Sequence, residues 1–183
     1  MARGGGVTVD KRPQGIDVSV FNGDITSALK GKQFAFARAS IGNGYDGAFK
    51  HHLADMREQG IVTGAYHYAT YGPGPTRQAR LFLKYALDAE ILAVDAESSV
   101  LRYPKTIRAI VINIRNLDPL KRPIALYSSE GTWPGNMTQD FNWVANWSRE
   151  PRLHWAFWQR RGAPLDLDVF NGTLAELHTL AGR

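Results

Sequence analysis

Short apolar segments recur between turn residues along most of the chain, and this recurrence limits its possible folds more than any other feature. Each segment has the length of one strand, and helical patterns lie between the early ones. Strands that alternate with helices predict βαβ units and a parallel sheet, as in a β/α barrel. The expected strands are 16–21, 34–40, 61–68, 91–97, 124–128, 142–147, 155–159 and 165–170.

Helices are expected at 45–59, 75–87 and 105–117, with a further short one at 24–30. Gly60 follows the first as a helix end, and Pro75 begins the second where a missing N–H costs least. No helical period lies between Ser128 and Phe170, so the last strands must be joined by loops or hairpins. The 183 residues are also fewer than the roughly 250 of a usual TIM barrel. We therefore expect an α/β fold, an irregular, flattened TIM-like β/α barrel with about eight strands and fewer helices than strands.

One globular domain fits this length and composition. Residues 1–14 are rich in glycine and are expected to form a flexible N-terminal arm, followed by a single barrel domain over 15–183. The chain contains no cysteine, which excludes thiol nucleophiles, disulfides and thiolate–zinc sites. Neither a membrane-spanning stretch nor the apolar part of a signal peptide is present, so we expect no export signal and no stable membrane association.

Basic residues outnumber acidic ones by 22 to 17, which gives a formal charge of +5. This balance favours encounter with polyanions such as nucleic acid or an anionic cell envelope. The basic residues are scattered along the sequence, with Lys121-Arg122 and Arg160-Arg161 as the densest pairs, and no basic helix or aromatic RNA-binding motif is evident. Nucleic acid is therefore the weaker of these two expected partners.

Two carboxylates one residue apart, Asp95 and Glu97, end the apolar segment 91–97. Side chains at i and i+2 of a strand share a face, so these two acids would be neighbours. A like charge and partial burial raise the proton affinity of one acid while the other stays ionised, which is the division of roles that glycosidic-bond cleavage requires. A strand that merely runs out into a polar loop has the same sequence pattern.

The carboxyl ends of barrel strands converge on one site, and further acids and aromatics occupy such positions. Asp17 lies in the first expected strand, Tyr66 in the third and Asp166 in the last, so four acids would meet at one mouth. Aromatic residues at strand ends can stack on sugar rings or pack in the core. We favour a sugar-binding role for Tyr66 and Tyr127, and for Trp147 both readings stay open.

Seven short motifs occur in one order over almost the whole chain. They are Gly-Ile-Asp-Val-Ser at 15–19, Gly-Ala-Tyr-His-Tyr at 64–68, Val-Asp-Ala-Glu at 94–97, Pro-Ile-Ala-Leu-Tyr at 123–127, Trp-Val-Ala at 143–145, Trp158-Gln159, and Asp166 with Phe170 and Asn171-Gly172. This ordered set resembles glycoside hydrolase family 25 lysozymes, the Chalaropsis-type muramidases that also form catalytic domains of phage endolysins. The resemblance implies cleavage of the β-1,4 bond between N-acetylmuramic acid and N-acetylglucosamine in bacterial peptidoglycan, by a monomer without metal or cofactor.

The resemblance also assigns roles to residues. Glu97 matches the general acid and should have a raised pKa, because it must be protonated at rest. Asp95 would stay ionised and orient the substrate's 2-acetamido group in a retaining reaction, with covalent nucleophile or inverting general base as alternatives. The expected substrate-binding residues are Asp17, Asp166, Tyr66, Tyr127, Trp147 and Gln159.

Four positions depart from the family pattern: Ile41 where glutamate is common, Trp147 where tyrosine is common, Asp168 where asparagine is common, and a position near Ile25 where a tryptophan usually follows the first strand. These changes bear on the preferred peptidoglycan more than on the chemistry, because Asp95 and Glu97 are present. Two other functions stay open, a catalytically inactive glycan-binding module of the same fold and a hydrolase of a different amino-sugar glycan. The expected place of action is the bacterial cell wall, reached outside the cell or by release from a phage-infected one.

Overall fold

A closed sheet forms the body of the protein, for which the computed structural model describes residues 10–183. Within that range the sheet order is β1-β9-β8-β7-β6-β5-β4-β2-β3, and an added pairing of β1 with β2 closes eight of the strands into a barrel. The strands are β1 Gln14–Val18, β2 Phe34–Ile41, β3 Gly44–Tyr45, β4 Val62–Tyr68, β5 Ile91–Asp95, β6 Ile124–Ser129, β7 Phe141–Ala145, β8 Phe157–Arg161 and β9 Asp166–Phe170. The short β3 forms a hairpin with the end of β2, outside the ring.

The barrel is mixed rather than fully parallel. Strands β2 and β4 to β8 are parallel neighbours, whereas β9 runs antiparallel to both β8 and β1. The reversal follows from the connection between β8 and β9, residues 162–165, which is too short for a crossover helix. The expected irregular β/α barrel is therefore confirmed, and β9 is the strand that makes it irregular.

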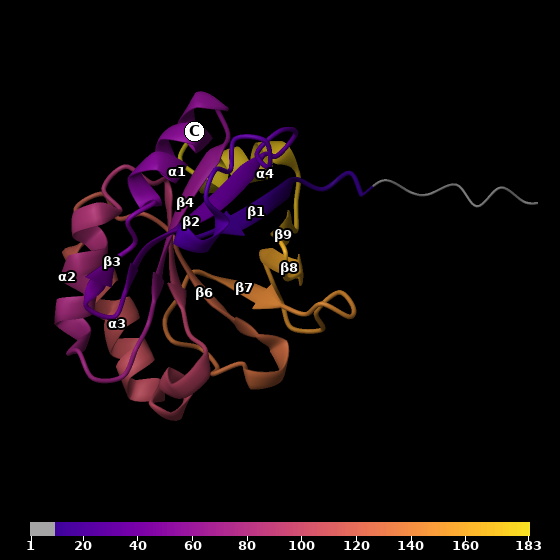
Figure 1. Cartoon of the computed structure of the whole chain (residues 1–183). Coiled ribbons are helices and arrows are strands. Elements are labelled where there is room, and N and C mark those ends of the chain that lie inside the picture. The colour runs from indigo at the N-terminus through magenta and orange to yellow at the C-terminus, as the bar shows by residue number, and fades with distance from the viewer. Residues whose placement is uncertain (1–9) are drawn as a thin grey trace, which may run out of the picture.

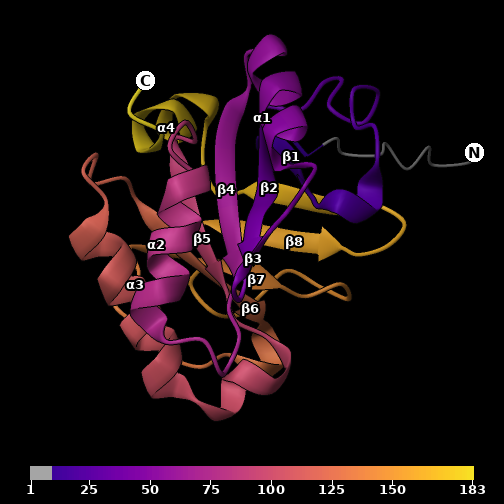
Figure 2. The same cartoon turned by 60° about the vertical axis from the view of Figure 1, so that its left-hand side comes forward.

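Helices cover only part of this barrel. The described α-helices are α1 Phe49–Glu58, α2 Pro75–Tyr85, α3 Pro104–Leu117 and α4 Leu174–Leu180. In α3, Ile107, Ile110, Val111 and Ile114 follow the i, i+3, i+4, i+7 pattern and are all buried. Helices α1 to α3 lie along one side, while strands β6, β7 and β8 follow one another without an α-helix between them (Figures 1 and 2).

Three local predictions were wrong. Residues 24–30 form turns rather than a helix, and Asp24 Oδ1 accepts from Thr26 N in the first of these turns. Tyr45 lies in β3, so the first helix begins later than expected. Helix α4 was not expected, although Thr173 and Glu176 form a capping box that marks its start.

Aromatic side chains fill the barrel interior in place of the usual aliphatic layers. Phe36 stacks on Trp143 with ring centroids 4.5 Å apart, and Phe157 meets Phe36 edge to face at 5.1 Å. Phe34 and Phe170 belong to the same cluster, which Leu177 of α4 completes. The interior is thus packed, and Trp143 forms the floor beneath the strands' carboxyl ends.

Gly64 makes room for this aromatic layer, and we expect Gly64→Ala to destabilise the fold. A Cβ at Gly64 would lie 2.1 Å from the Phe36 ring, which is itself held by Trp143. Overpacking of this kind costs about 1–3 kcal/mol, measurable as a lower urea midpoint. Gly47→Ala is the matched control, since a Cβ there meets nothing within 4 Å. Equal midpoints for the two variants would contradict the packing argument.

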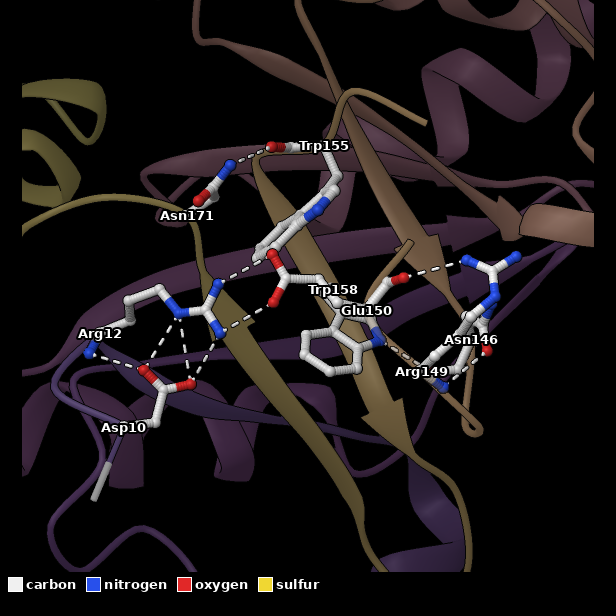
Figure 3. Close-up of polar contacts among 8 residues, drawn as sticks. All are labelled: Asp10, Arg12, Asn146, Arg149, Glu150, Trp155, Trp158 and Asn171. Atoms are coloured by element: carbon white, nitrogen blue, oxygen red, sulfur yellow. Dashed lines mark hydrogen bonds and ion pairs between the residues drawn. The ribbon is translucent and has the colours of Figure 1, made fainter. Parts of the chain in front are cut away.

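The start of the described chain is held against the barrel. Arg12 donates to Asp10 and Glu150, and its guanidinium lies 5.3 Å from the ring centroid of Trp155 (Figure 3). Gln14 already belongs to β1. The rest of the expected arm, residues 1–9, lies outside the described residues. From residue 10 onward, no helix combines the length and the apolar character needed to cross a bilayer.

Candidate functional site

All eight predicted site residues line one pocket of about 250 Å³ at the carboxyl ends of the strands. They are Asp17, Tyr66, Asp95, Glu97, Tyr127, Trp147, Gln159 and Asp166. The pocket wall also contains Arg38, Tyr68 and Trp143, which the sequence analysis did not select. Arg38 had a signal, as the lone cation in the segment Phe-Ala-Phe-Ala-Arg-Ala at 34–39.

Strand register brings Asp95 to the centre of the pocket wall. Asp95 is the last residue of the otherwise apolar β5 and pairs with Tyr68 of β4 on one side and Tyr127 of β6 on the other. Glu97 lies beyond the strand end but keeps an extended backbone, with φ −142° and ψ 178°. Residues i and i+2 therefore still face the same space, as the sequence predicted.

A strained residue follows the acid pair. Ser98 has φ 56°, a left-handed conformation that is uncommon for a residue other than glycine, and it opens the 3-10 helix Ser98–Arg102. Tyr68 Oη donates to Ser98 Oγ at 3.1 Å. The sharp turn and this hydrogen bond together hold Glu97 at the pocket.

Both acids of the pair bind protons more tightly than free carboxyls. Burial and the charge of Glu97 raise the pKa of Asp95 well above its usual value, and the Arg38 guanidinium opposes the rise. Burial and the charge of Asp166 raise the pKa of Glu97. Asp95 is the more deeply buried of the two at 6% exposed, and burial is the largest cause of the rise in its pKa. The sequence analysis expected a raised pKa for Glu97 and an ionised Asp95.

A second carboxyl pair lies deeper in the barrel. Asp168 is fully buried, its Oδ1 accepts from Trp143 Nε1 at 2.8 Å, and its Oδ2 has no hydrogen-bonding partner within residues 10–183. Asp17 is the neighbouring carboxyl, and a proton on either acid would allow a hydrogen bond between the two. Burial raises the pKa of Asp168 to about 7 and that of Asp17 well above its usual value. The pair therefore holds a proton more tightly than two free carboxyls would.

Gln159 joins this buried pair to the aromatic wall. Its Nε2 donates to Asp17 Oδ2 at 2.7 Å, and its Oε1 accepts from Tyr127 Oη and Trp147 Nε1, both at 3.0 Å. Trp147 is 66% exposed, so its ring stands at the pocket rim while its N–H is anchored inside. The arrangement orients one aromatic face toward the open space.

We expect Gln159→Met to release this anchor. The substitution keeps the side chain's length but leaves buried donors and an acceptor without partners, which costs about 1–3 kcal/mol in the free energy of unfolding. Acrylamide quenching of tryptophan fluorescence should rise as the Trp147 ring becomes mobile. The matched control is Gln59→Met at an exposed position after α1, for which neither quantity should change. Unaltered quenching in Gln159→Met would show that Gln159 does not hold Trp147.

A larger pocket of about 620 Å³ adjoins the first and shares Glu97, Tyr127 and Trp147 with it. The added wall comes from the segments that follow β6 and β7. Glu130, after β6, accepts from Asn146 Nδ2 at 2.6 Å and pairs with Arg149 at 2.9 Å, both in the segment after β7. Trp158 Nε1 donates to the carbonyl of Asn146, which fixes the start of the same segment (Figure 3). The two pockets form one cleft with Glu97 at their junction.

The described residues hold no group of three or more metal-ligating side chains placed to bind a metal ion. His67 is buried, with its ring nitrogens hydrogen-bonded to Ser40 and Gln78, and burial lowers its pKa to about 4. It is a neutral packing residue. The cleft therefore offers acids, amides and aromatic faces.

Fold and site together define a mixed β/α barrel with a carboxyl-lined cleft at its mouth. The catalytic domain of endolysin ply40 from bacteriophage P40 of Listeria monocytogenes has this fold, with a TM-score of 0.79, 19% identity, and coverage of 96% of this chain and 100% of that one. The bacterial lysozyme from Streptomyces coelicolor shares it at a TM-score of 0.77, 24% identity, and coverage of 94% and 98%.

The chain belongs to glycosyl hydrolases family 25, whose sequence model matches residues 16–162. The uncharacterized protein YegX of Escherichia coli K12 is 33% identical over 168 residues, which cover 79% of this chain and 61% of YegX. The chain thus spans about three-fifths of that relative's length. Lysozyme M1 from Streptomyces globisporus is 29% identical over 208 residues, covering 92% of this chain and 71% of the relative. The family suggested by the motifs is confirmed.

Proposed function

We propose that the protein is a muramidase that acts at the bacterial cell wall and cleaves the β-1,4 bond between N-acetylmuramic acid and N-acetylglucosamine in peptidoglycan. One observation carries this proposal: Asp95 and Glu97 line the same aromatic-walled pocket, and Glu97 also lines the larger pocket that adjoins it. A glycan strand that fills both pockets would pass its scissile bond beside these carboxyls. Relatives named lysozyme M1 and endolysin ply40 support the same chemistry.

Glu97 is the proposed general acid. It borders both pockets, so its carboxyl can reach the oxygen that joins the sugars bound in them. Glu97 is only partly buried, and a bound sugar would exclude water from it and raise its pKa further. The acid would therefore be most strongly protonated when substrate is present.

Asp95 is the proposed electrostatic partner. Its Oδ1 is buried and accepts no hydrogen bond within the described part of the chain, so it can accept one from the N–H of the sugar's 2-acetamido group. That bond and the nearby Arg38 would favour the ionised form of Asp95. Substrate binding thus favours a proton on Glu97 and an ionised Asp95, and the acetamido oxygen, oriented by Asp95, attacks the anomeric carbon in a retaining reaction.

The remaining pocket residues bind and orient the glycan. Tyr66, Tyr127 and Trp147 offer aromatic surfaces for sugar rings, while Asp17, Gln159 and Asp166 offer hydrogen-bonding groups. Because Trp147 borders both pockets, it can contact the sugars on both sides of the scissile bond.

Digestion of purified, defined peptidoglycan with mass spectrometry of the products tests the proposal. A muramidase releases fragments whose new reducing end is N-acetylmuramic acid. A new N-acetylglucosamine end would instead indicate a hydrolase of a different bond. Binding to peptidoglycan without any released fragment would indicate a glycan-binding module of the same fold.

A further inference from the structure

Two neighbouring helices carry basic residues without any acidic ones. Residues 75–87, which contain α2, and residues 98–117, which contain the 3-10 helix and α3, include no aspartate or glutamate. Their basic residues are Arg77, Arg80, Lys84, Arg102, Lys105, Arg108 and Arg115. Each stretch therefore carries positive charge alone.

Six of these side chains are exposed and unpaired. Of the seven, Arg115 alone forms an ion pair, with Asp140 at 3.0 Å, within residues 10–183. The other six, here called the basic face, are all exposed and make no side-chain hydrogen bond to any described residue. Their charge is consequently available to an outside partner.

The fold brings the two basic stretches, which are separate in the sequence, next to each other. Helices α2 and α3 pack against each other and run side by side on the outside of the barrel (Figures 1 and 2). The expectation of scattered basic residues, with no basic helix, is therefore wrong in three dimensions. Conversely, one of the densest sequence pairs contributes little to the surface, since Arg122 is buried against Asp118.

The charges form rows along the helices. Arg77, Arg80 and Lys84 are spaced i, i+3, i+7, and Arg102, Lys105 and Arg108 follow one another at intervals of three. At about 1.5 Å rise per helical residue, α2 presents a cation every 4.5–6 Å or so along its length. Such rows match a linear polymer with regularly repeated negative charges better than a single small anion.

The basic face begins beside the catalytic cleft. Helix α2 follows β4 and α3 follows β5, so their first turns lie at the end of the barrel where Tyr68 and Asp95 line the pocket. At this end Tyr71 and Tyr103 stack on each other with ring centroids 3.6 Å apart. A polymer on the basic face would therefore lie close to a glycan in the cleft.

We propose that the basic face binds a phosphodiester-linked polyol polymer attached to the cell wall, and so holds the protein on its substrate. The inference rests on the proposed function, because it places this anionic polymer on the same matrix as the glycan. A nucleic acid fits less well, since the exposed side chains of the rows include no aromatic ring to stack between bases, and the inner faces of Tyr71 and Tyr103 cover each other.

Sedimentation of the protein with purified walls tests the inference. All proteins carry Glu97→Gln, so the walls stay intact and binding is measured whether or not the chain hydrolyses them. The test variant is Arg77→Gln/Arg80→Gln/Lys84→Gln, and the control is Lys11→Gln/Lys30→Gln/Lys50→Gln, which removes the same charge from exposed positions elsewhere. Each is measured on intact walls, on walls stripped of their phosphate polymer by hydrofluoric acid, and at two salt concentrations.

We expect the test variant to bind intact walls about tenfold or more weakly than the control, with a shallower salt dependence. Stripped walls should bind both proteins equally weakly. Equal binding of the two variants to intact walls, or undiminished binding to stripped walls, would overturn the inference. Competition by duplex DNA or anionic vesicles at lower phosphate concentration than the soluble wall polymer would reassign the face to nucleic acid or membrane. Loss of hydrolysis in the digestion experiment would affect none of these readouts.

Discussion

Peptidoglycan hydrolysis is expected to fall about 10²- to 10⁴-fold in Glu97→Gln, which is the usual contribution of a general acid. Glutamine matches glutamate in shape but supplies no acidic proton to the leaving oxygen. Glu97 is N-terminal to a turn fixed by Ser98 and makes no side-chain hydrogen bond to the described residues, so its replacement should leave the fold intact. The effect should appear in kcat rather than in KM.

Release of muramic acid reducing ends from purified walls measures this loss. Glu58→Gln, at an exposed position in α1, provides the matched control and should keep full activity. In Glu97→Gln the pKa of Asp95 should also drop, because one cause of its rise is the charge of Glu97. Equal rates of release for Glu97→Gln and the wild-type protein would remove Glu97 from the mechanism.

Asp168→Asn is expected to stabilise the protein at alkaline pH relative to the wild type. Asparagine can still accept from Trp143 Nε1 through its Oδ1, and its Nδ2 can donate to Asp17 in place of a proton between the two acids. The variant therefore keeps, at every pH, the hydrogen bonds that the wild-type pair can make only when it is protonated. The family pattern agrees, since asparagine is common at this position.

The direction of this pH effect on the free energy of unfolding follows from the linkage between proton binding and folding. The folded-state pKa of Asp168, about 7, lies above its ordinary value of 3.8, so the folded protein binds this proton more tightly than the unfolded chain. The resulting stabilisation is complete below about pH 4 and is lost as pH rises through about 7. The variant lacks this loss, so its free energy of unfolding relative to wild type should increase by roughly 2–4 kcal/mol between pH 4 and pH 8.

Urea unfolding of both proteins across this range provides the measurement. His67, whose pKa is lowered to about 4, has the opposite effect below about pH 6.5, but it is present in both proteins and cancels in the difference. Asp88→Asn, at an exposed position, should show a difference that does not vary with pH. A flat difference for Asp168→Asn as well would mean that the buried pair holds no extra proton.

Local sequence patterns predicted the elements well where each pattern was self-contained. The apolar run before Asp95 gave β5, and Pro75 and Pro104 begin α2 and α3 as proline does in a first helical turn. The short helix α4 was not predicted, although its start is marked in the sequence by the Thr173–Glu176 capping box. The helix predicted at residues 24–30 does not form. The Asp24 side chain accepts from Thr26 N and stabilises a turn there instead.

What the sequence determined by itself was the order of strands and helices, the family, and the closeness of Asp95 to Glu97. The elements and the acid pair depend on residues near one another along the chain, where backbone geometry fixes the outcome. The family follows from short motifs in a fixed order over almost the whole chain. Only the tertiary structure decided the reversal of β9, the bond between Gln159 and Asp17 across 142 positions, and the gathering of the basic face on α2 and α3. The proton preferences belong with these, because burial and neighbouring charge are set by strands that meet only when the barrel closes.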